Sequence, residues 1–217
     1  MIPLILGWLL SAAPHAPPLP APSSAVSIAS LAPHANRDAL ELALAAMRCA
    51  QGSGVGVDAS RLAFIDYSRP STEPRLWVFD LERNRLLYEE VVAHGQGSGE
   101  NLAKMFSNVS GSHASSLGLF LTRDTYHGRN GYSLRMDGLE PGVNDAAMER
   151  AIVMHGAPYV DPDTAAIQGR LGRSHGCPAV REAVARGMID VLKGGQFVFA
   201  YYPDATLLDR SKWKCAS

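Results

Sequence analysis

The sequence lacks a strong excess of charge of either sign. Its 217 residues include 20 Lys and Arg against 21 Asp and Glu, which gives a formal net charge of −1 and an isoelectric point near 6.6. Proteins that bind nucleic acid or anionic membranes through electrostatics carry a basic surplus. The balance of charge therefore disfavours nucleic acid and other polyanions as partners.

Long hydrophobic runs are also missing. After the opening residues, no stretch approaches the ~20 apolar residues that a transmembrane helix needs, so we expect no stable membrane insertion. The opening run from Met1 to Ala13 is too short to span a bilayer and is followed by small residues, as in a secretory signal peptide. It lacks the basic residues that usually begin such a peptide, so a disordered or buried N-terminal segment stays an alternative.

Cysteine is scarce. The three cysteines, Cys49, Cys177 and Cys215, suit neither a zinc cage nor a dense disulfide scaffold. If the chain is exported to an oxidising compartment, Cys49 and Cys215 could pair and leave Cys177 free. Isolated thiols are an equal alternative, because two cysteines near opposite ends of a chain say little about their distance in space.

The composition divides the chain into a leader, a linker and one domain. A signal peptide is predicted over residues 1–25, and residues 26–35 belong to a Pro-, Ala- and Ser-rich stretch that is typical of a linker. Residues 36–217 are expected to form a single domain, because a chain with 47% hydrophobic residues can bury one substantial core. The domain begins with an amphipathic helix that Asn36 caps and Gly52 ends.

Apolar runs after this helix predict a sheet. Strands are expected at Arg61–Tyr67, Arg75–Leu81, Arg85–Val92, Leu117–Arg123, Tyr132–Met136, Ala151–Gly156 and Gln196–Tyr202. Apolar residues occur on both strand faces at Trp77, Val78 and Phe79, which implies a sheet that is covered on both sides. Helices are expected over Asn144–Arg150 and from Pro178 to Gly194. The pattern predicts a β-dominated α+β fold with a few flanking helices.

Cys177 stands directly before a proline, which is tolerated at the first position of a helix because its missing N–H has no partner there. We therefore expect a helix to begin at Pro178 and Cys177 to lie at its N-cap. Free N–H groups and the positive end of the helix macrodipole would favour a thiolate at that position. Such a cysteine is expected to titrate below the usual value of about 8.5 and to act as a nucleophile.

Two further groups would complete the chemistry that a thiolate needs. The apolar run Ala151–Gly156 predicts a buried strand with His155 at its tip, and we assign His155 as the base that accepts the thiol proton. A histidine that only packs in the core is the alternative. Gly176 leaves the backbone before the sulfur uncrowded, so the N–H groups of Gly176 and Cys177 could form an oxyanion hole.

His155, followed after eighteen residues by Ser174-His175-Gly176-Cys177, resembles the signature of the YkuD-type L,D-transpeptidases, which remodel bacterial peptidoglycan with a catalytic cysteine. Further blocks between roughly residues 60 and 203 are similar to one subgroup of that family: Val92–Gly95, Gly97–Gly99, Phe106–Asn108, Ser115–Gly118, Gly131–Arg135 and Gly138–Leu139. Many members continue after the cysteine with an apolar residue and then Asn or Arg. Here Pro178 and Ala179 follow, which leaves open the side chain that meets the substrate carboxylate there.

The resemblance implies a mixed β-sandwich-like catalytic fold and a cysteine acyl transferase that acts on peptidoglycan peptide stems. Cys177 would attack the carbonyl between the L-centre of diaminopimelate and a terminal D-alanine. His155 would take the thiol proton and later protonate the leaving amine. An amine of another stem, or water, would resolve the thioester, which makes the enzyme an L,D-transpeptidase or an L,D-carboxypeptidase.

The same resemblance implies no metal and no organic cofactor, and it implies acylation by carbapenems. Together with the leader, it predicts export to the periplasm or cell envelope of a bacterium. The sequence leaves the oligomeric state and the choice of acyl acceptor open, because both depend on surfaces that a linear pattern does not define.

The remaining candidates lie around the motif and in loops rich in glycine and serine. His175 is counted with the catalytic group but is expected to line the site, because one base suffices for one thiol. Arg173 could bind a substrate carboxylate or be a solvated surface residue. Ser174 could fix the base or close the turn. His94 and Tyr132 are candidates for substrate contact, with turn chemistry and core packing as their alternatives.

Other classes of protein stay open. A zinc amidohydrolase could use His155, His175 and Cys177 with His94 or His127, although His-x-Cys is not a usual zinc spacing and no His-Glu pair supports it. A wall-binding module without turnover would carry Cys177 as an ordinary thiol. A papain-like hydrolase is disfavoured, because its cysteine usually precedes its histidine in the chain.

Overall fold

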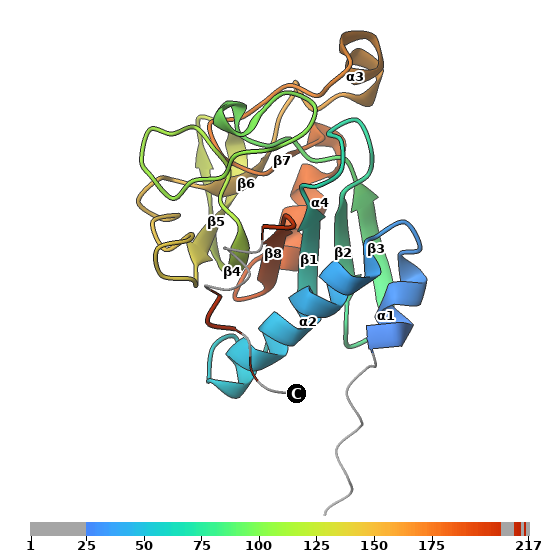
Figure 1. Ribbon diagram of the computed structural model, residues 1–217, viewed down its shortest axis with the longest axis vertical. Helices are drawn as coiled ribbons and strands as arrows, with labels where there is room; N and C mark the ends of the chain where they lie inside the picture. Colours follow the sequence, from blue (N-terminus) through green and yellow to red (C-terminus); the bar gives the residue numbers. More distant parts are fainter. Residues whose placement is uncertain (1–24, 205–210, 214, 216–217) are drawn as a thin grey trace, which may run out of the picture.

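One curved sheet forms the centre of the molecule. The computed structural model describes residues 25–204, 211–213 and 215. The strands are β1 (Arg61–Asp66), β2 (Leu76–Asp80), β3 (Arg85–Glu90), β4 (Gly118–Gly128), β5 (Gly131–Gly138), β6 (Val153–Gly156), β7 (Ala179–Val180) and β8 (Phe197–Tyr201). The helices are α1 (Ala25–Leu31), α2 (Arg37–Gly52), α3 (Pro162–Gln168), α4 (Glu182–Leu192) and the short 3-10 helix η1 (Gln96–Ser98). Figure 1 shows α2 lying across one side of the strands.

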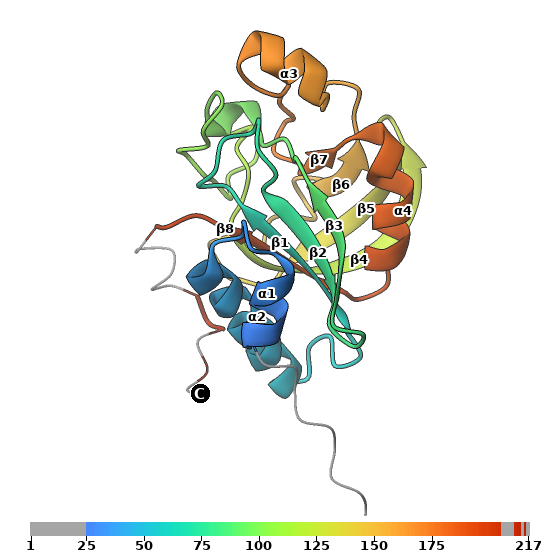
Figure 2. The same cartoon turned by 90° about the vertical axis from the view of Figure 1, so that its right-hand side faces the viewer.

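The eight strands are joined in the order β3-β2-β1-β8-β4-β5-β6-β7. β1 pairs in parallel with β8 and β6 in parallel with β7, whereas the other neighbours are antiparallel. Figure 2 shows the sheet curving so that β4, β5 and β6 pass round the side of α4. The predicted β-dominated α+β class is confirmed: the eight strands form a single curved sheet, and the buried side of α4 packs against one face of it.

Both faces of the sheet are buried, as the run of apolar residues in β2 predicts. Val78 belongs to the apolar cluster between the sheet and α4, whereas Trp77 and Phe79 pack with α2 on the other face. All three side chains are fully buried. Successive residues of a strand point to opposite faces, so a continuous apolar run fits a sheet that is covered twice.

The N-terminal helix of the domain begins and ends where the sequence predicts. Asn36 Oδ1 accepts a hydrogen bond from the Ala39 N–H at 3.1 Å, and α2 ends at Gly52. The predicted linker over residues 26–35 is wrong, because α1 occupies most of it and Ile28 is fully buried in the cluster that includes α2. The average composition of the stretch hides its apolar residues that pack against α2, Ile28 and Ala32 among them.

Residues 1–24, which hold nearly all of the predicted signal peptide, lie outside the described residues. Within the described ranges, each helix is too short or too polar to cross a bilayer.

The predicted helix over Asn144–Arg150 is also wrong, because the segment forms a succession of turns. The Asn144 side chain donates to the carbonyl oxygens of Leu117 at 2.8 Å and Leu119 at 3.0 Å, and its Oδ1 accepts from the Glu140 N–H at 2.8 Å. These bonds tie the segment to β4 in an irregular conformation. The segment therefore ends with Arg150 directed toward the loops around Cys177.

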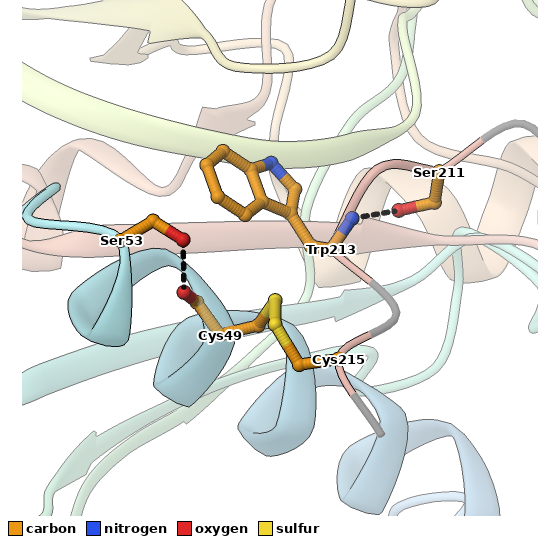
Figure 3. The surroundings of a disulfide bond; sticks show 5 residues. All are labelled: Cys49, Ser53, Ser211, Trp213 and Cys215. Atoms are coloured by element: carbon orange, nitrogen blue, oxygen red, sulfur yellow. Dashed lines mark hydrogen bonds between the residues drawn. A yellow bond between two sulfur atoms is a disulfide. The ribbon is translucent and has the colours of Figure 1, made fainter.

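A disulfide joins Cys49 in α2 to Cys215 near the C-terminus, with Cα atoms 5.5 Å apart. Figure 3 shows this bond beside Trp213, which is 6% exposed and packs in the same apolar cluster as Cys49. Of the two alternatives that the sequence leaves open, the structure shows the pairing, and Cys177 is the free cysteine. The bond fastens the end of the chain to α2 across 166 positions of sequence.

Candidate active site

Cys177 lies in a loop at the edge of the sheet. Pro178 follows it and leads into β7, and α4 begins only at Glu182. The predicted start of this helix at Pro178 is therefore wrong. Ala179 in β7 pairs with His155 in β6. A proline is tolerated at the start of a strand, as it is at the start of a helix. The sulfur does not lie at the N-terminus of α4.

The Cys177 thiol is almost fully buried, with 9% of the residue exposed. Its Sγ accepts a hydrogen bond from the Val153 N–H at 3.5 Å and donates to the Ala151 carbonyl at 3.6 Å. Burial raises the pKa of this thiol, and the Val153 N–H and the Arg150 guanidinium oppose the increase. The predicted lowering of this pKa is therefore wrong. Cys177 rests as a thiol and needs a base to become a strong nucleophile.

His155 is the residue before the last in β6 and is 3% exposed. Its Nδ1 lies 2.9 Å from the carbonyl oxygen of Gly156, which can only accept, so Nδ1 carries the proton. The lone pair of Nε2 is then available to take a proton. Burial lowers the pKa of His155, so the ring is neutral at pH 7 and has the form that a general base requires.

A cavity of about 200 Å³ brings the imidazole and the sulfur together. Its lining consists of Asn130, His155, Tyr159, Arg173, Ser174, His175 and Cys177. Five of the predicted site residues thus surround one opening. The parallel pairing of β6 with β7 creates this arrangement, because it sets Ala179 opposite His155 and so brings the loop before β7 beside Val153.

Ser174 closes the turn that carries Cys177. Its Oγ donates to the Cys177 carbonyl at 2.6 Å and accepts from the Gly176 N–H at 3.1 Å. Gly176 has φ +119°, and a Cβ there would lie 2.9 Å from the Ala114 carbonyl oxygen, so the turn requires glycine. The predicted oxyanion hole needs a correction, because the Gly176 N–H is engaged. Of the two donors, the Cys177 N–H alone has no acceptor among the described residues.

His175 and Arg173 lie at the rim of the cavity. His175 is exposed, and its ring stacks on His113 with centroids 4.2 Å apart and planes 7° from parallel. Arg173 donates to the Gly99 carbonyl at 2.9 Å and to the Glu100 carboxylate at 2.8 Å. A ligand carboxylate that binds Arg173 must share this guanidinium with Glu100 or displace it.

His94 and Tyr132, two predicted substrate contacts, are not among the residues that line the cavity. His94 is fully buried, and its Nδ1 lies 2.7 Å from Nη2 of the equally buried Arg75. Burial and this guanidinium lower the pKa of His94 to about 4, so it is a neutral interior group. Ser133 in β5 pairs with His155, and Tyr132 comes directly before Ser133, so the Tyr132 side chain points to the other face of the sheet. There its hydroxyl donates to Asp190 of α4 at 2.8 Å.

No sequence motif assigns three residues of the site: Asn130, Arg150 and Tyr159. Tyr159 lines the cavity, and burial followed by the nearby Cys177 sulfur raises the pKa of its phenol to about 12. Arg150 is close enough to Cys177 for its charge to oppose the rise in the pKa of the thiol, and it donates to the Ala114 carbonyl at 2.7 Å. A weak signal for Arg150 is present, because it is the last charged residue before the strand that carries His155.

The zinc alternative needs His94 or His127 near Cys177. His94 instead contacts Arg75, and the ring of His127 packs against Tyr132 with centroids 5.2 Å apart. Across the part of the chain that the structure describes, no three His, Cys, Asp or Glu side chains are grouped to hold a metal ion. The positions of these histidines give the zinc alternative no support.

The family model described as L,D-transpeptidase catalytic domain matches residues 31–201. The match covers most of the chain, and the protein therefore belongs to this family of bacterial cell-wall enzymes. A comparison with curated proteins finds no match.

Solved structures that resemble this chain come from several organisms. An L,D-transpeptidase from Mycobacterium smegmatis is 14% identical, with a TM-score of 0.41 and coverage of 66% of this chain and 59% of that one. The helical cell shape determining protein Pgp2 from Campylobacter jejuni is 11% identical, with a TM-score of 0.45 and coverage of 67% and 48%. An L,D-transpeptidase from Stackebrandtia nassauensis is 13% identical, with a TM-score of 0.37 and coverage of 83% and 90%. The chain thus spans about half to three fifths of the length of the first two.

Proposed function

We propose that the protein is a peptidoglycan L,D-transpeptidase that works through a thioester on Cys177. Its donor is a tetrapeptide stem in which diaminopimelate precedes a terminal D-alanine. The Cys177 sulfur bonds to the diaminopimelate carbonyl carbon, the bond to the D-alanine nitrogen breaks, and D-alanine leaves with the proton that His155 took from the thiol. An amine of a second stem then attacks the thioester, which forms an amide and restores the thiol.

The observation that carries this proposal is a buried thiol and a neutral imidazole in one cavity. The Gly156 carbonyl keeps Nδ1 of His155 protonated and leaves Nε2 as the proton acceptor. Because burial holds Cys177 as a thiol, the proton must move as the sulfur attacks. The Cys177 N–H is oriented by the turn and supplies one donor to the oxyanion that forms on the substrate carbonyl.

The rim of the cavity suits an anionic peptide. Arg170 and Arg173 both pair with Glu100, at 2.8 Å each, so the three groups together keep one positive charge. Peptide stems carry several carboxylates, and a guanidinium binds a carboxylate through two parallel hydrogen bonds. Within the proposal, Arg173 holds a stem carboxylate at the entrance while the carbonyl reaches Cys177.

The proposal places the enzyme in the periplasm or cell envelope. The disulfide between Cys49 and Cys215 supports export, because disulfides persist in oxidising compartments and are rare in reducing ones.

Incubation of the purified protein with defined tetrapeptide muropeptides, followed by product masses, tests the proposal. A cross-linked dimer that has lost one D-alanine is the expected product. A monomer with the same loss would identify water as the acceptor and an L,D-carboxypeptidase. Unchanged muropeptides would contradict both activities and favour a wall-binding module. A chelator should leave turnover intact, whereas loss of turnover would favour the zinc alternative.

Cys177→Ala is the matched control for this experiment, because it removes the sulfur and leaves the turn and the disulfide in place. It should abolish turnover and any covalent adduct with a carbapenem in intact-mass measurement. Turnover retained in Cys177→Ala would overturn the assignment of the nucleophile.

A further inference from the structure

Arg150 places a positive charge behind the candidate nucleophile. It ends the turns of residues 144–150, and its guanidinium reaches the loop before β4 and the turn of Cys177. A Cβ built on Gly176 would lie 3.4 Å from Arg150 Nη2, so the guanidinium packs against the residue that precedes the sulfur. The charge of this guanidinium acts on the Cys177 sulfur, and Arg150 is not among the residues that line the cavity.

Four neutral acceptors hold the guanidinium. Nη1 donates to the Ser107 carbonyl and to Ser116 Oγ at 2.6 Å each, and Nη2 donates to the Ala114 carbonyl at 2.7 Å and to Ser112 Oγ at 3.2 Å. Among the ion pairs of the described residues, none includes Arg150. The hydrogen bonds therefore fix the position of the cation while no carboxylate compensates its charge. Such a cation stabilises an anion that forms beside it.

The other groups around the sulfur supply no such charge. The titratable and charged groups that face Cys177 are His155, Tyr159, Arg173 and His175 around the cavity, with Arg150 and Tyr67 behind it. Both phenols keep their protons, because burial raises the pKa of each to about 12. The base on β6 is neutral, Arg173 is paired with Glu100, and His175 stacks on His113 at the exposed rim. Arg150 is the cation that faces the sulfur without an opposing carboxylate.

We propose that Arg150 stabilises the thiolate of Cys177 as it forms and positions the loop behind it. The inference rests on the proposed function, because it takes Cys177 as the nucleophile, and it adds the group that supports this nucleophile. Arg150 acts through Cys177 and does not reach the substrate, so it is a positioning residue. A helix that began at Pro178 would stabilise the thiolate through its dipole, but α4 begins only at Glu182. Arg150 supplies a positive charge near the sulfur instead.

The pH dependence of alkylation of Cys177 by iodoacetamide tests this inference, since the disulfide leaves Cys177 as the free thiol. Arg150→Met removes the charge and should raise the pH midpoint of alkylation by about one unit. At a given pH below the midpoint, this shift means roughly tenfold less thiolate. Arg150→Lys keeps the charge and should shift the midpoint much less. Arg48→Met removes an exposed arginine from α2 and should leave the midpoint unchanged.

Two results would overturn the inference: equal midpoints in the native protein and Arg150→Met, or equal shifts in Arg150→Met and Arg150→Lys. The second result would reduce the role of Arg150 to hydrogen bonding. If near-UV circular dichroism shows that Arg150→Met does not fold, Arg150→Gln makes the same comparison, because it keeps an N–H donor without the charge. Alkylation needs no peptidoglycan, so failure of turnover on muropeptides would contradict the proposed function without deciding the role of Arg150.

Discussion

At the scale of single residues, burial acts in opposite directions on the two candidate reacting groups. It raises the pKa of Cys177 and lowers the pKa of His155, so both are uncharged before a substrate enters. A neutral thiol beside a neutral imidazole avoids the desolvation cost of an ion pair in a buried cavity. The proton therefore moves during attack, and the rate of attack depends on keeping His155 unprotonated.

Thioester formation should slow as the pH falls through the pKa of His155, which lies below its ordinary value of 6.5. The lowered pKa keeps Nε2 free to accept a proton until the pH passes below that pKa, where protonation removes the base. Acylation rates measured over a pH series check this. His155→Gln should reduce the rate by about 10²–10⁴-fold and remove the acidic limb. An acidic limb centred well above 6.5 would contradict a neutral histidine in the resting site.

At the scale of elements, a turn and a two-residue strand place the sulfur. Ser115 Oγ accepts from the Gly95 N–H at 3.0 Å and donates to the Gly176 carbonyl at 3.1 Å, which links the loop after β3 to the turn of Cys177. Ser174 closes the same turn from within. Backbone and side-chain atoms of neighbouring elements lie close to Gly176, so a Cβ added there would require the turn to shift.

Gly176→Ala should destabilise the protein by more than the about 1–2 kcal/mol that a left-handed conformation costs a residue with a Cβ. The added methyl would lie 2.9 Å from both the Ala114 carbonyl oxygen and Ile152 Cδ1, so the turn must shift. Gly54→Ala is the matched control, because Gly54 also has positive φ but nothing within 4 Å. Urea unfolding compares the two variants. Equal losses would show that close packing at Gly176 is unimportant.

At the scale of the whole molecule, the disulfide between Cys49 and Cys215 lies away from the candidate site. The disulfide fastens Cys215 to α2, and Figure 1 shows α2 toward the opposite end of the sheet from β6 and β7. Trp213, just before Cys215, packs in the cluster on the α2 face of the sheet. The bond is therefore expected to act on stability and to leave the chemistry of Cys177 unchanged.

Replacing both Cys49 and Cys215 with serine should lower the free energy of unfolding by about 2–4 kcal/mol, because a long loop regains entropy in the unfolded chain. Urea unfolding with and without a thiol reductant measures the effect. The double variant should not respond to reductant, whereas Cys177→Ser keeps the disulfide and should respond as the native protein does. Equal stability of the native protein and the double variant would contradict a stabilising role.

Patterns of residues that are close together in the chain are enough to predict most of the local elements and the candidate reacting residues. The Asn36 cap, the strand that carries His155 and the apolar face of α2 are correct because each depends on residues close together in the chain. The motif around Cys177 likewise identified five of the residues that line the cavity. For Cys49 and Cys215 the sequence offered pairing and isolation equally, since distance along a chain says little about distance in space.

Features that depend on residues far apart in the chain follow from the fold. Pro178 fits both a helix start and the entry to a strand, and pairing between β6 and β7 selected the strand. The acceptors of the Arg150 guanidinium lie between 34 and 43 positions away in the sequence, so no local pattern predicts that Arg150 is close to Cys177. The pKa values of Cys177 and His155 follow from burial, which is set by all surrounding side chains together and by no single stretch of sequence.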